Sequence, residues 1–277
     1  MRLGGPILEK YADPDAWVMA LRKEGYGAAY CPVDEDADAA AISAYARAAA
    51  AAGIVIAEVG AWSNPLSIDE KQRREAITLC QSRLALADQI GARCCVNIAG
   101  SRGPKWDGPC GEDLTDSAFD LIVESVREII DAVRPARTFY TLETMPWMYP
   151  NSADSYLRLI EAIDRDRFAA HLDPVNLINS PERYFGNAAV IRECFEKLGP
   201  HIRSCHAKDI LLSERLTVHL DEVSPGKGAL DYRAFLEQLD RLDADMPLMM
   251  EHMEGAEYVQ AARYIRSVAE ETGIRLL

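Results

Sequence analysis

Short apolar segments alternate with helix-like segments along the whole chain, and this alternation restricts the fold more than any other feature. Eight short runs have the apolar, often β-branched character of buried strands, and each is followed by a segment with helical spacing of its apolar residues. Because the intervening helices carry the chain back between strands, the strands run parallel. Eight such units in 277 residues predict one closed (β/α)8 TIM barrel, for which about 250 residues is typical.

No linker or compositional break divides the chain, so we expect a single domain over residues 1–277. A doubly wound open sheet is the alternative, but it usually has a GxGxxG turn after its first strand, and none occurs here. A Ser67-x-x-Glu70 pattern predicts a capping box, and residues 207–231 predict a long loop. The expected strands are 3–6, 27–31, 54–57, 94–98, 139–142, 168–172, 202–206 and 247–250, and the expected helices 14–24, 37–52, 67–90, 115–133, 152–163, 188–198, 232–239 and 256–271.

Four of the expected strands end on a side chain that can bind a metal. Each stands where an apolar run gives way to a loop, and the intervals are 30, 33 and 45 residues, about one strand–helix unit each. In a parallel barrel the carboxyl ends of the strands form one face, where active sites lie. We therefore predict that the four side chains converge on a divalent-metal site. They are Glu143, Asp173, His206 and Glu251.

This expected ligand set is rich in oxygen, with three carboxylates and one imidazole. It suits Mn²⁺, Mg²⁺ or Co²⁺ better than a sulfur-rich zinc site would. We expect one divalent metal ion, with Mn²⁺ preferred and Mg²⁺, Co²⁺ or Zn²⁺ as alternatives. Such an ion can stabilise the enediolate that forms when a proton leaves the carbon beside a sugar carbonyl. Proton transfer also needs a base, and Glu143 and Glu251, on different strands, could act as ligand and base at once.

Five segments carry a wider pattern: Leu142-Glu143, His171-Leu172-Asp173, His206-Ala207-Lys208-Asp209, Pro225-Gly226-Lys227-Gly228 with Asp231 and Tyr232, and Met250-Glu251. Together they resemble the xylose isomerase-like barrel superfamily of sugar and sugar phosphate isomerases and epimerases, over most of the chain. The ligand order Glu, Asp, His, Glu is that of the ketose 3-epimerases. The resemblance implies a metal-dependent isomerase or epimerase of a keto-sugar or sugar phosphate, with Glu143 and Glu251 as both ligands and catalytic acid/bases and with Asp173 and His206 as ligands.

Around the metal set the sequence departs from the ketose 3-epimerases. Asn176 stands where they usually carry a substrate-binding histidine, Tyr149 where they carry another glutamate, and Leu212 where they carry an arginine. The metal core matches while the substrate-binding residues differ. A lyase or dehydratase that acts on a keto-sugar, keto-inositol or keto-C-glycoside through the same enolate is therefore the alternative.

Several residues near the expected strand ends are candidates for contacting a sugar. Trp62 and Trp147 lie in loops expected at this face, where an aromatic ring can cover a sugar ring, although packing beneath the loops is the alternative. Asn97 and Asn176 can hydrogen-bond hydroxyl groups. Lys208 can polarise a substrate oxygen or hold a phosphate, although an ion pair with an acid would also account for it.

Three further ionisable residues have less specific expectations. Glu58 ends the third expected strand and could face the site. His171 shares a strand face with Asp173, one layer deeper, so we expect it in the core rather than among the ligands. His252 directly follows an expected ligand and should point to the opposite face.

Charge and composition disfavour other partners. A net charge of −14 and a pI of about 4.8 oppose generic binding to nucleic acid or anionic membranes. No apolar run approaches the roughly 20 residues of a membrane span, and the start of the chain lacks the apolar core of a signal peptide. The seven cysteines form no CxxC pair and indicate reduced thiols. We expect a cytoplasmic protein whose partner is a small-molecule sugar, with a homo-oligomer left open.

Two other functions share this fold. An endonuclease IV-like hydrolase assembles several zinc ions with many histidines, including some from early strands, whereas no histidine here precedes His171. A non-catalytic sugar-binding barrel would not need both candidate acid/bases. A metal-dependent exchange assay separates this last alternative from an enzyme.

Overall fold

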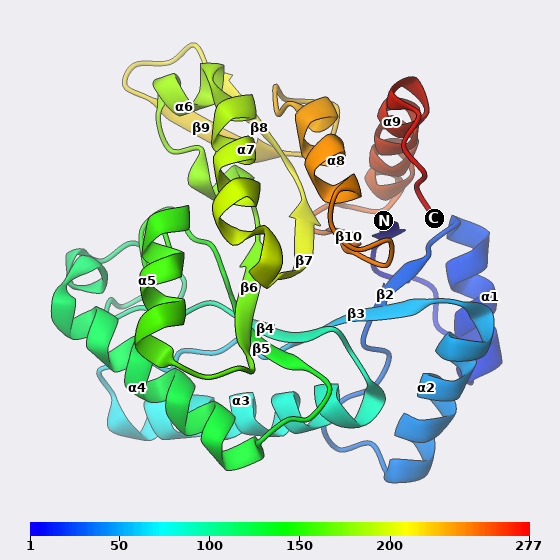
Figure 1. Cartoon of the computed structure of the whole chain (residues 1–277), viewed down its shortest axis with the longest axis horizontal. Coiled ribbons are helices and arrows are strands. Elements are labelled where there is room, and N and C mark those ends of the chain that lie inside the picture. Colours follow the sequence, from blue (N-terminus) through cyan, green and yellow to red (C-terminus); the bar gives the residue numbers. More distant parts are fainter.

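Eight parallel strands close into a barrel surrounded by helices (Figure 1). The computed structural model describes residues 1–277. Neighbouring strands follow the order β1-β10-β7-β6-β5-β4-β3-β2, so the first strand pairs with the last. This confirms the predicted (β/α)8 TIM barrel. The barrel strands are β1 (Arg2–Gly4), β2 (Ala28–Tyr30), β3 (Val55–Gly60), β4 (Cys94–Asn97), β5 (Phe139–Glu143), β6 (Phe168–Leu172), β7 (Ile202–Ala207) and β10 (Pro247–Met250).

The helices lie outside the barrel and bury one apolar face against it. In α4, Phe119, Ile122, Val126 and Ile129 recur at helical spacing and are all buried. The helix ends where Arg134 adopts a left-handed backbone with φ 52°. The helices are α1 (Pro14–Glu24), α2 (Ala39–Ala52), α3 (Glu70–Ile90), α4 (Asp116–Val133), α5 (Ala153–Ile163), α6 (Pro181–Phe185), α7 (Asn187–Leu198), α8 (Tyr232–Asp240) and α9 (Ala256–Thr272), with 3-10 turns at Gly111–Leu114, Val175–Leu177 and Gly199–His201.

The long helix α3 begins later than the capping-box pattern predicts. The Asp69 carboxylate accepts a hydrogen bond from the Gln72 N–H at 3.0 Å, so Asp69 is the residue that caps the helix. The Ser67 hydroxyl instead accepts the Asp69 N–H at 3.2 Å, just upstream of the helix. The capping-box prediction was wrong because a second good capping residue lies two positions closer to the helix.

Residues 209–223 form a hairpin instead of the expected long loop. β8 (Asp209–Ser213) and β9 (His219–Val223) pair antiparallel as a separate two-stranded sheet, drawn in yellow in Figure 1. The Asp209 carboxylate fixes the following turn by accepting the N–H of Gly226 at 2.9 Å and of Gly228 at 3.1 Å. A side chain at Gly228 would collide with this carboxylate, so glycine is required there. The turn is therefore structural, and its N–H groups are already bonded within the protein.

The two chain ends meet at the barrel. The Leu3 N–H donates to the Leu277 carbonyl at 2.8 Å, and the Leu277 N–H donates to the Met1 carbonyl at 3.1 Å. These bonds join the last residues to the first strand, which is itself paired with β10. No helix of the structure has both the length and the apolar character needed to cross a bilayer.

Candidate metal centre

Four ligand-type side chains meet at the carboxyl ends of β5, β6, β7 and β10. One candidate ligand atom from each lies within 4.8 Å of the other three. Asp173 and His206 are fully buried, and the Glu251 side chain is 13% exposed. The barrel closure accounts for this convergence, because these strands are consecutive neighbours in the sheet. The structure thus brings together all four residues that the sequence predicts as ligands, with Glu143 5% exposed.

The donor atoms in this cluster fit a divalent cation. His206 Nδ1 faces the carboxylates of Glu251, at 2.9 Å, and Glu143, at 3.2 Å. Asp173 Oδ2 and Glu251 Oε1 are buried and accept no hydrogen bond, although the Lys208 ammonium lies close to both. Three carboxylates share this buried space with one ammonium and one imidazole, so a divalent cation bound among them would offset the negative charge that remains. Carboxylate oxygens with one imidazole nitrogen are ligands that Mn²⁺ and Mg²⁺ accept.

Burial and the charges of His206 and Lys208 act in opposite directions on the carboxyl groups of the cluster, with different results at Asp173 and Glu251. Burial is the largest influence on Asp173 and raises its pKa to about 6 against the attraction of Lys208, with the Glu143 charge acting in the same direction as burial. Burial also opposes the ionisation of Glu251, but the charges of His206 and Lys208 outweigh it and hold the pKa of Glu251 well below its usual range. The site therefore favours an ionised Glu251.

Beneath this cluster lies a second buried layer formed by Glu58, His171 and Ser204. The Glu58 carboxylate contacts His171 Nε2 at 2.9 Å and His206 Nε2 at 3.4 Å, and it accepts a short hydrogen bond from the Ser204 hydroxyl. Burial opposes the ionisation of Glu58, but the charges of the two imidazoles lower its pKa. A neutral His206 that donates its Nε2 proton to Glu58 has its Nδ1 free to bind a metal ion beside the candidate ligand carboxylates.

Two residues of this second layer, His171 and Glu58, had less specific expectations from the sequence. His171 is fully buried beside His206, with ring centroids 4.1 Å apart, as expected for a core histidine. Glu58 does point into the barrel, but β3 continues to Gly60, three residues beyond the expected strand 54–57. The longer strand places Glu58 one layer below the ligands instead of among them.

A cavity of about 580 Å³ opens above the four candidate ligands. Glu143, Lys208 and Glu251 lie on its lining, so the carboxylates face the space a substrate would enter. The side formed by the loops after β3, β4 and β5 carries three tryptophans, of which Trp62 is 43% exposed and Trp147 36% exposed. Indole rings beside ionised groups suit a molecule that has both an apolar face and hydroxyl groups. The third tryptophan is Trp106.

Two of the expected substrate contacts lie in positions that differ sharply. Asn176 lines the cavity, and its Nδ2 donates to Glu143 Oε1 at 3.1 Å. Asn97 does not reach the cavity: its side chain is fully buried and its Oδ1 accepts the Ser63 N–H at 3.2 Å. The expectation that Asn97 binds substrate is therefore corrected. Asn97 ends β4 pointing outward, toward Cys80 on α3, where it holds the loop between β3 and α3.

Two residues of the cavity were not predicted correctly from the sequence: Glu222 was missed, and His252 was expected on the opposite face. Glu222 on β9 lies 3.3 Å from the Lys208 ammonium, so the unexpected hairpin supplies part of the cavity wall. His252 was expected to point away from the site, but it lines the same cavity, and its Nδ1 lies 3.0 Å from Glu222. The strand alternation does not hold at His252, because this residue has left β10 and adopts φ 57°. The hydrogen bond to Glu222 raises the pKa of His252.

Solved structures with the same architecture include enzymes of several kinds. The structure of L-ribulose 3-epimerase is 16% identical and gives a TM-score of 0.70, covering 98% of this chain and 95% of that one. The probable 3-DHS dehydratase AsbF from Bacillus anthracis, involved in petrobactin synthesis, is 15% identical with a TM-score of 0.70, covering 97% and 99%. A xylose isomerase-like TIM barrel protein from Mycobacterium smegmatis, solved in complex with magnesium, is 18% identical with a TM-score of 0.66, covering 95% and 90%.

At these identities the solved structures show a shared fold. No curated protein sequence matches the chain. The model of one protein family, the xylose isomerase-like TIM barrel, matches residues 19–268, which include all four candidate ligands. The chain therefore belongs to the xylose isomerase-like TIM barrel family.

Proposed function

We propose that this protein is a divalent-metal-dependent isomerase or epimerase that moves a proton beside the carbonyl of a keto-sugar or sugar phosphate. The observation that carries the proposal is the placement of Glu143 and Glu251. Both face one cavity beside one cluster of candidate ligands, yet they lie at the ends of β5 and β10, which are separated in the barrel by β6 and β7. Two carboxylates on different sides of a substrate can remove a proton on one face and return one on the other.

The surrounding residues support these two roles. Asn176 donates to Glu143 Oε1, which orients that carboxylate, and His206 Nδ1 lies close to both glutamates. When bound, a divalent ion, for which Mn²⁺ is our first choice, supplies stabilisation of the negative charge that develops on the substrate oxygens. Trp62 and Trp147 offer rings against which the apolar face of a sugar can lie.

A lyase or dehydratase is the second candidate, and His252 is the observation that favours it. Its pKa is raised by the hydrogen bond to Glu222, so the imidazole is biased towards its charged form beside Glu251. After a carboxylate removes the proton beside the carbonyl, the hydroxyl on the next carbon leaves with a proton from His252, and water is released. The dehydratase and the epimerase thus share the removal of a proton and differ in the second step, which is loss of water in one and return of a proton in the other.

Solvent-deuterium exchange tests the shared first step. The protein is incubated in D₂O with a panel of free and phosphorylated keto-sugars, inositol-like ketones and keto-glycosides, with Mn²⁺ or with EDTA. Glu251→Gln removes a proposed base, while Glu222→Gln changes a carboxylate of the same cavity outside the candidate ligand set. We expect exchange that requires metal and falls at least about 100-fold in Glu251→Gln, but much less in Glu222→Gln. Metal binding to each variant is measured separately.

The products of the same incubations separate the two candidates. An epimer or isomer of equal mass supports the first, whereas a product that has lost water or an aglycone supports the second. Absence of metal-dependent exchange into every member of the panel, despite a bound metal, would refute the proton-transfer mechanism for these substrates.

A further inference from the structure

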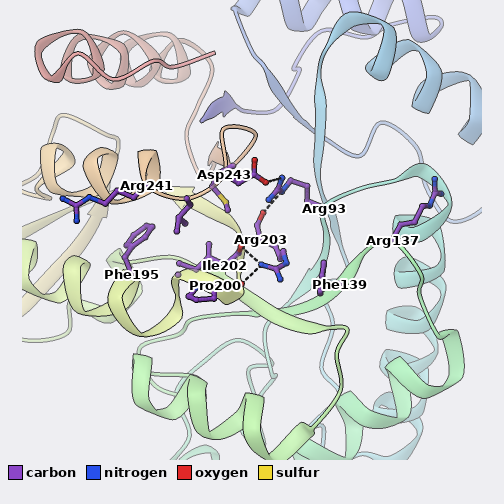
Figure 2. A pocket seen from close by; sticks show the side chains of 12 residues that line it. Arg93, Arg137, Phe139, Phe195, Pro200, Ile202, Arg203, Arg241 and Asp243 are labelled. Carbon is purple, nitrogen blue, oxygen red and sulfur yellow. Dashed lines mark hydrogen bonds and ion pairs between the residues drawn. The ribbon is translucent and has the colours of Figure 1, made fainter.

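A second hollow, of about 750 Å³, opens at the end of the barrel opposite to the candidate ligands (Figure 2). Its lining comes from the starts of strands: Arg93 precedes β4, Phe139 begins β5, and Arg203 is the second residue of β7. The candidate ligands lie at the other ends of the barrel strands, roughly 15 Å away for strands of four to six residues. This hollow is therefore distinct from the proposed active site.

Positive charge predominates in this hollow, although the chain as a whole carries −14. Four arginines line it with a single acidic residue, Asp243, which lies 2.8 Å from Arg93. Arg203 has no carboxylate within ion-pair distance, and the same holds for the other two arginines of the lining. Burial, and next the charge of Arg93, lower the pKa of Arg203, which shows that these like charges repel. The remaining two arginines are Arg137 and Arg241.

The two central guanidinium groups are held in place while keeping donors free. Arg203 Nη1 donates to the carbonyls of Pro200 and Ile202, both at 3.0 Å, and its guanidinium lies 4.2 Å from the centre of the Phe139 ring. Arg93 Nε donates to the Arg203 carbonyl at 3.2 Å, which sets the two side chains next to each other, as Figure 2 shows. Arg203 Nη2 and Nε, and Arg93 Nη2, have no acceptor in the protein.

A purely structural role accounts for only part of this arrangement. Bonds to carbonyls explain why Arg203 and Arg93 lie where they do, but not why Arg203 lies beside a second arginine without an acidic partner of its own in a chain with 44 acidic residues. Repulsion between them costs stability unless an anion is present. Phe195, Leu242 and Met246 add an apolar wall to the same hollow. A ligand that fits both the arginines and the apolar wall carries a compact double negative charge and an organic group.

We propose that this hollow is a binding site for a small phosphate monoester, whose phosphate is held by Arg93 and Arg203. Planar guanidinium groups bind phosphate through paired N–H donors, and the unused donors of the two side chains adjoin. The organic part of the ester lies against Phe195 and Leu242. The net charge of the whole chain repels a long polyanion such as nucleic acid. A small ester lies close to the arginines, so their local charge dominates its attraction to the site.

Titration calorimetry with phenyl phosphate, inorganic phosphate and phenol tests this site in the full-length protein. Arg203→Gln and Arg93→Gln remove a proposed phosphate contact, and Arg203→Lys keeps the charge without the paired donors. Arg165→Gln is the matched control, since Arg165 pairs with Asp131 on another part of the surface. We expect one phenyl phosphate per chain, bound more tightly than inorganic phosphate, and no binding of phenol. Each Gln variant should lose affinity at least about tenfold, Arg203→Lys less, and Arg165→Gln less than about twofold.

The outcomes separate this site from the metal centre. Unchanged affinity in Arg203→Gln and Arg93→Gln, or no binding to the unmodified protein, would overturn the proposal, and the exchange experiment on the metal centre would be unaffected by either result. Circular dichroism checks that each variant is folded.

Discussion

The Lys208 ammonium lies 2.9 Å from Asp173 Oδ2 and is only 3% exposed. The same nitrogen lies 2.5 Å from Glu251, 3.3 Å from Glu222 and 3.6 Å from Glu143. One buried cation thus faces four carboxylates. The backbone at Lys208 is held as well, because the Tyr232 hydroxyl donates to the Lys208 carbonyl at 2.7 Å. Lys208 therefore offsets part of the repulsion among the candidate ligands and cannot move away without leaving them uncompensated.

Replacing Lys208 with Met should destabilise the protein when no metal is present. Breaking one side of a buried ion pair costs about 3–5 kcal/mol, and here several carboxylates lose their partner. Added Mn²⁺ should restore part of the loss, because a bound cation replaces the missing charge. Urea unfolding with EDTA and with Mn²⁺ measures both effects. Lys227→Met, which removes a half-exposed pair with Glu257, should cost less than about 1 kcal/mol, and equal losses in the two variants would contradict the explanation.

Glu58→Gln should weaken metal binding although Glu58 is not a proposed ligand. The carboxylate contacts Nε2 of His206, and loss of such a supporting acceptor typically lowers metal affinity about 10–100-fold. Competition with a fluorescent chelator measures the affinity for Mn²⁺. Ser204→Ala removes only the hydroxyl that donates to Glu58, so its effect should be much smaller. A Glu58→Gln affinity equal to that of the unmodified protein would show that His206 is oriented by other contacts.

The two asparagines near the strand ends should behave in opposite ways. Asn97→Ala leaves the partly buried Ser63 N–H without its acceptor and should cost about 1–3 kcal/mol of stability, while the KM of any substrate found by the exchange panel stays unchanged. Asn176→Ala should change stability little but slow exchange, because Glu143 loses a hydrogen bond at the cavity. Thermal unfolding and exchange kinetics on the same two variants check this contrast. A raised KM in Asn97→Ala would show that Asn97 contacts the substrate after all.

Cys31 should make the fold less stable at high pH. Burial raises the pKa of its thiol from 9.0 to about 11. Between these values the unfolded chain loses the proton while the folded chain keeps it, so stability is full below pH 9 and falls as pH rises towards 11, by at most about 3 kcal/mol. Urea unfolding from pH 8 to pH 11 should therefore show a shallower decline in Cys31→Ala than in the unmodified protein or in Cys110→Ala. Identical slopes in all three would rule out this contribution.

The barrel and the ligand cluster were predictable because both depend on features that repeat. Each strand is an apolar run followed by a helical pattern, and barrel closure then brings together the strand ends that carry Glu143, Asp173, His206 and Glu251. That reasoning does not depend on the conformation of any loop. The convergence of these four side chains therefore follows from their places at the ends of neighbouring strands.

The hairpin and the orientation of Asn97 were not predictable by the same means. The strand β9, His219–Val223, is rich in charge and no residue in it is fully buried, so it lacks the apolar signal of a core strand. At Asn97 the difficulty is register, since moving a strand by one residue exchanges its inward and outward faces. β4 is only four residues long and buried throughout, so its sequence shows no alternation that would identify the inward face.

The strand order has a further consequence for how this protein can change. All four candidate ligands come from the second half of the chain, whereas the tryptophans Trp62 and Trp106 follow β3 and β4 in the first half. Two of the three tryptophans of the cavity are thus encoded apart from the candidate ligands, although Trp147 lies in the same half of the chain as the ligands. A new substrate range can arise by mutation or recombination within the first half, while the residues proposed to transfer the proton are inherited unchanged.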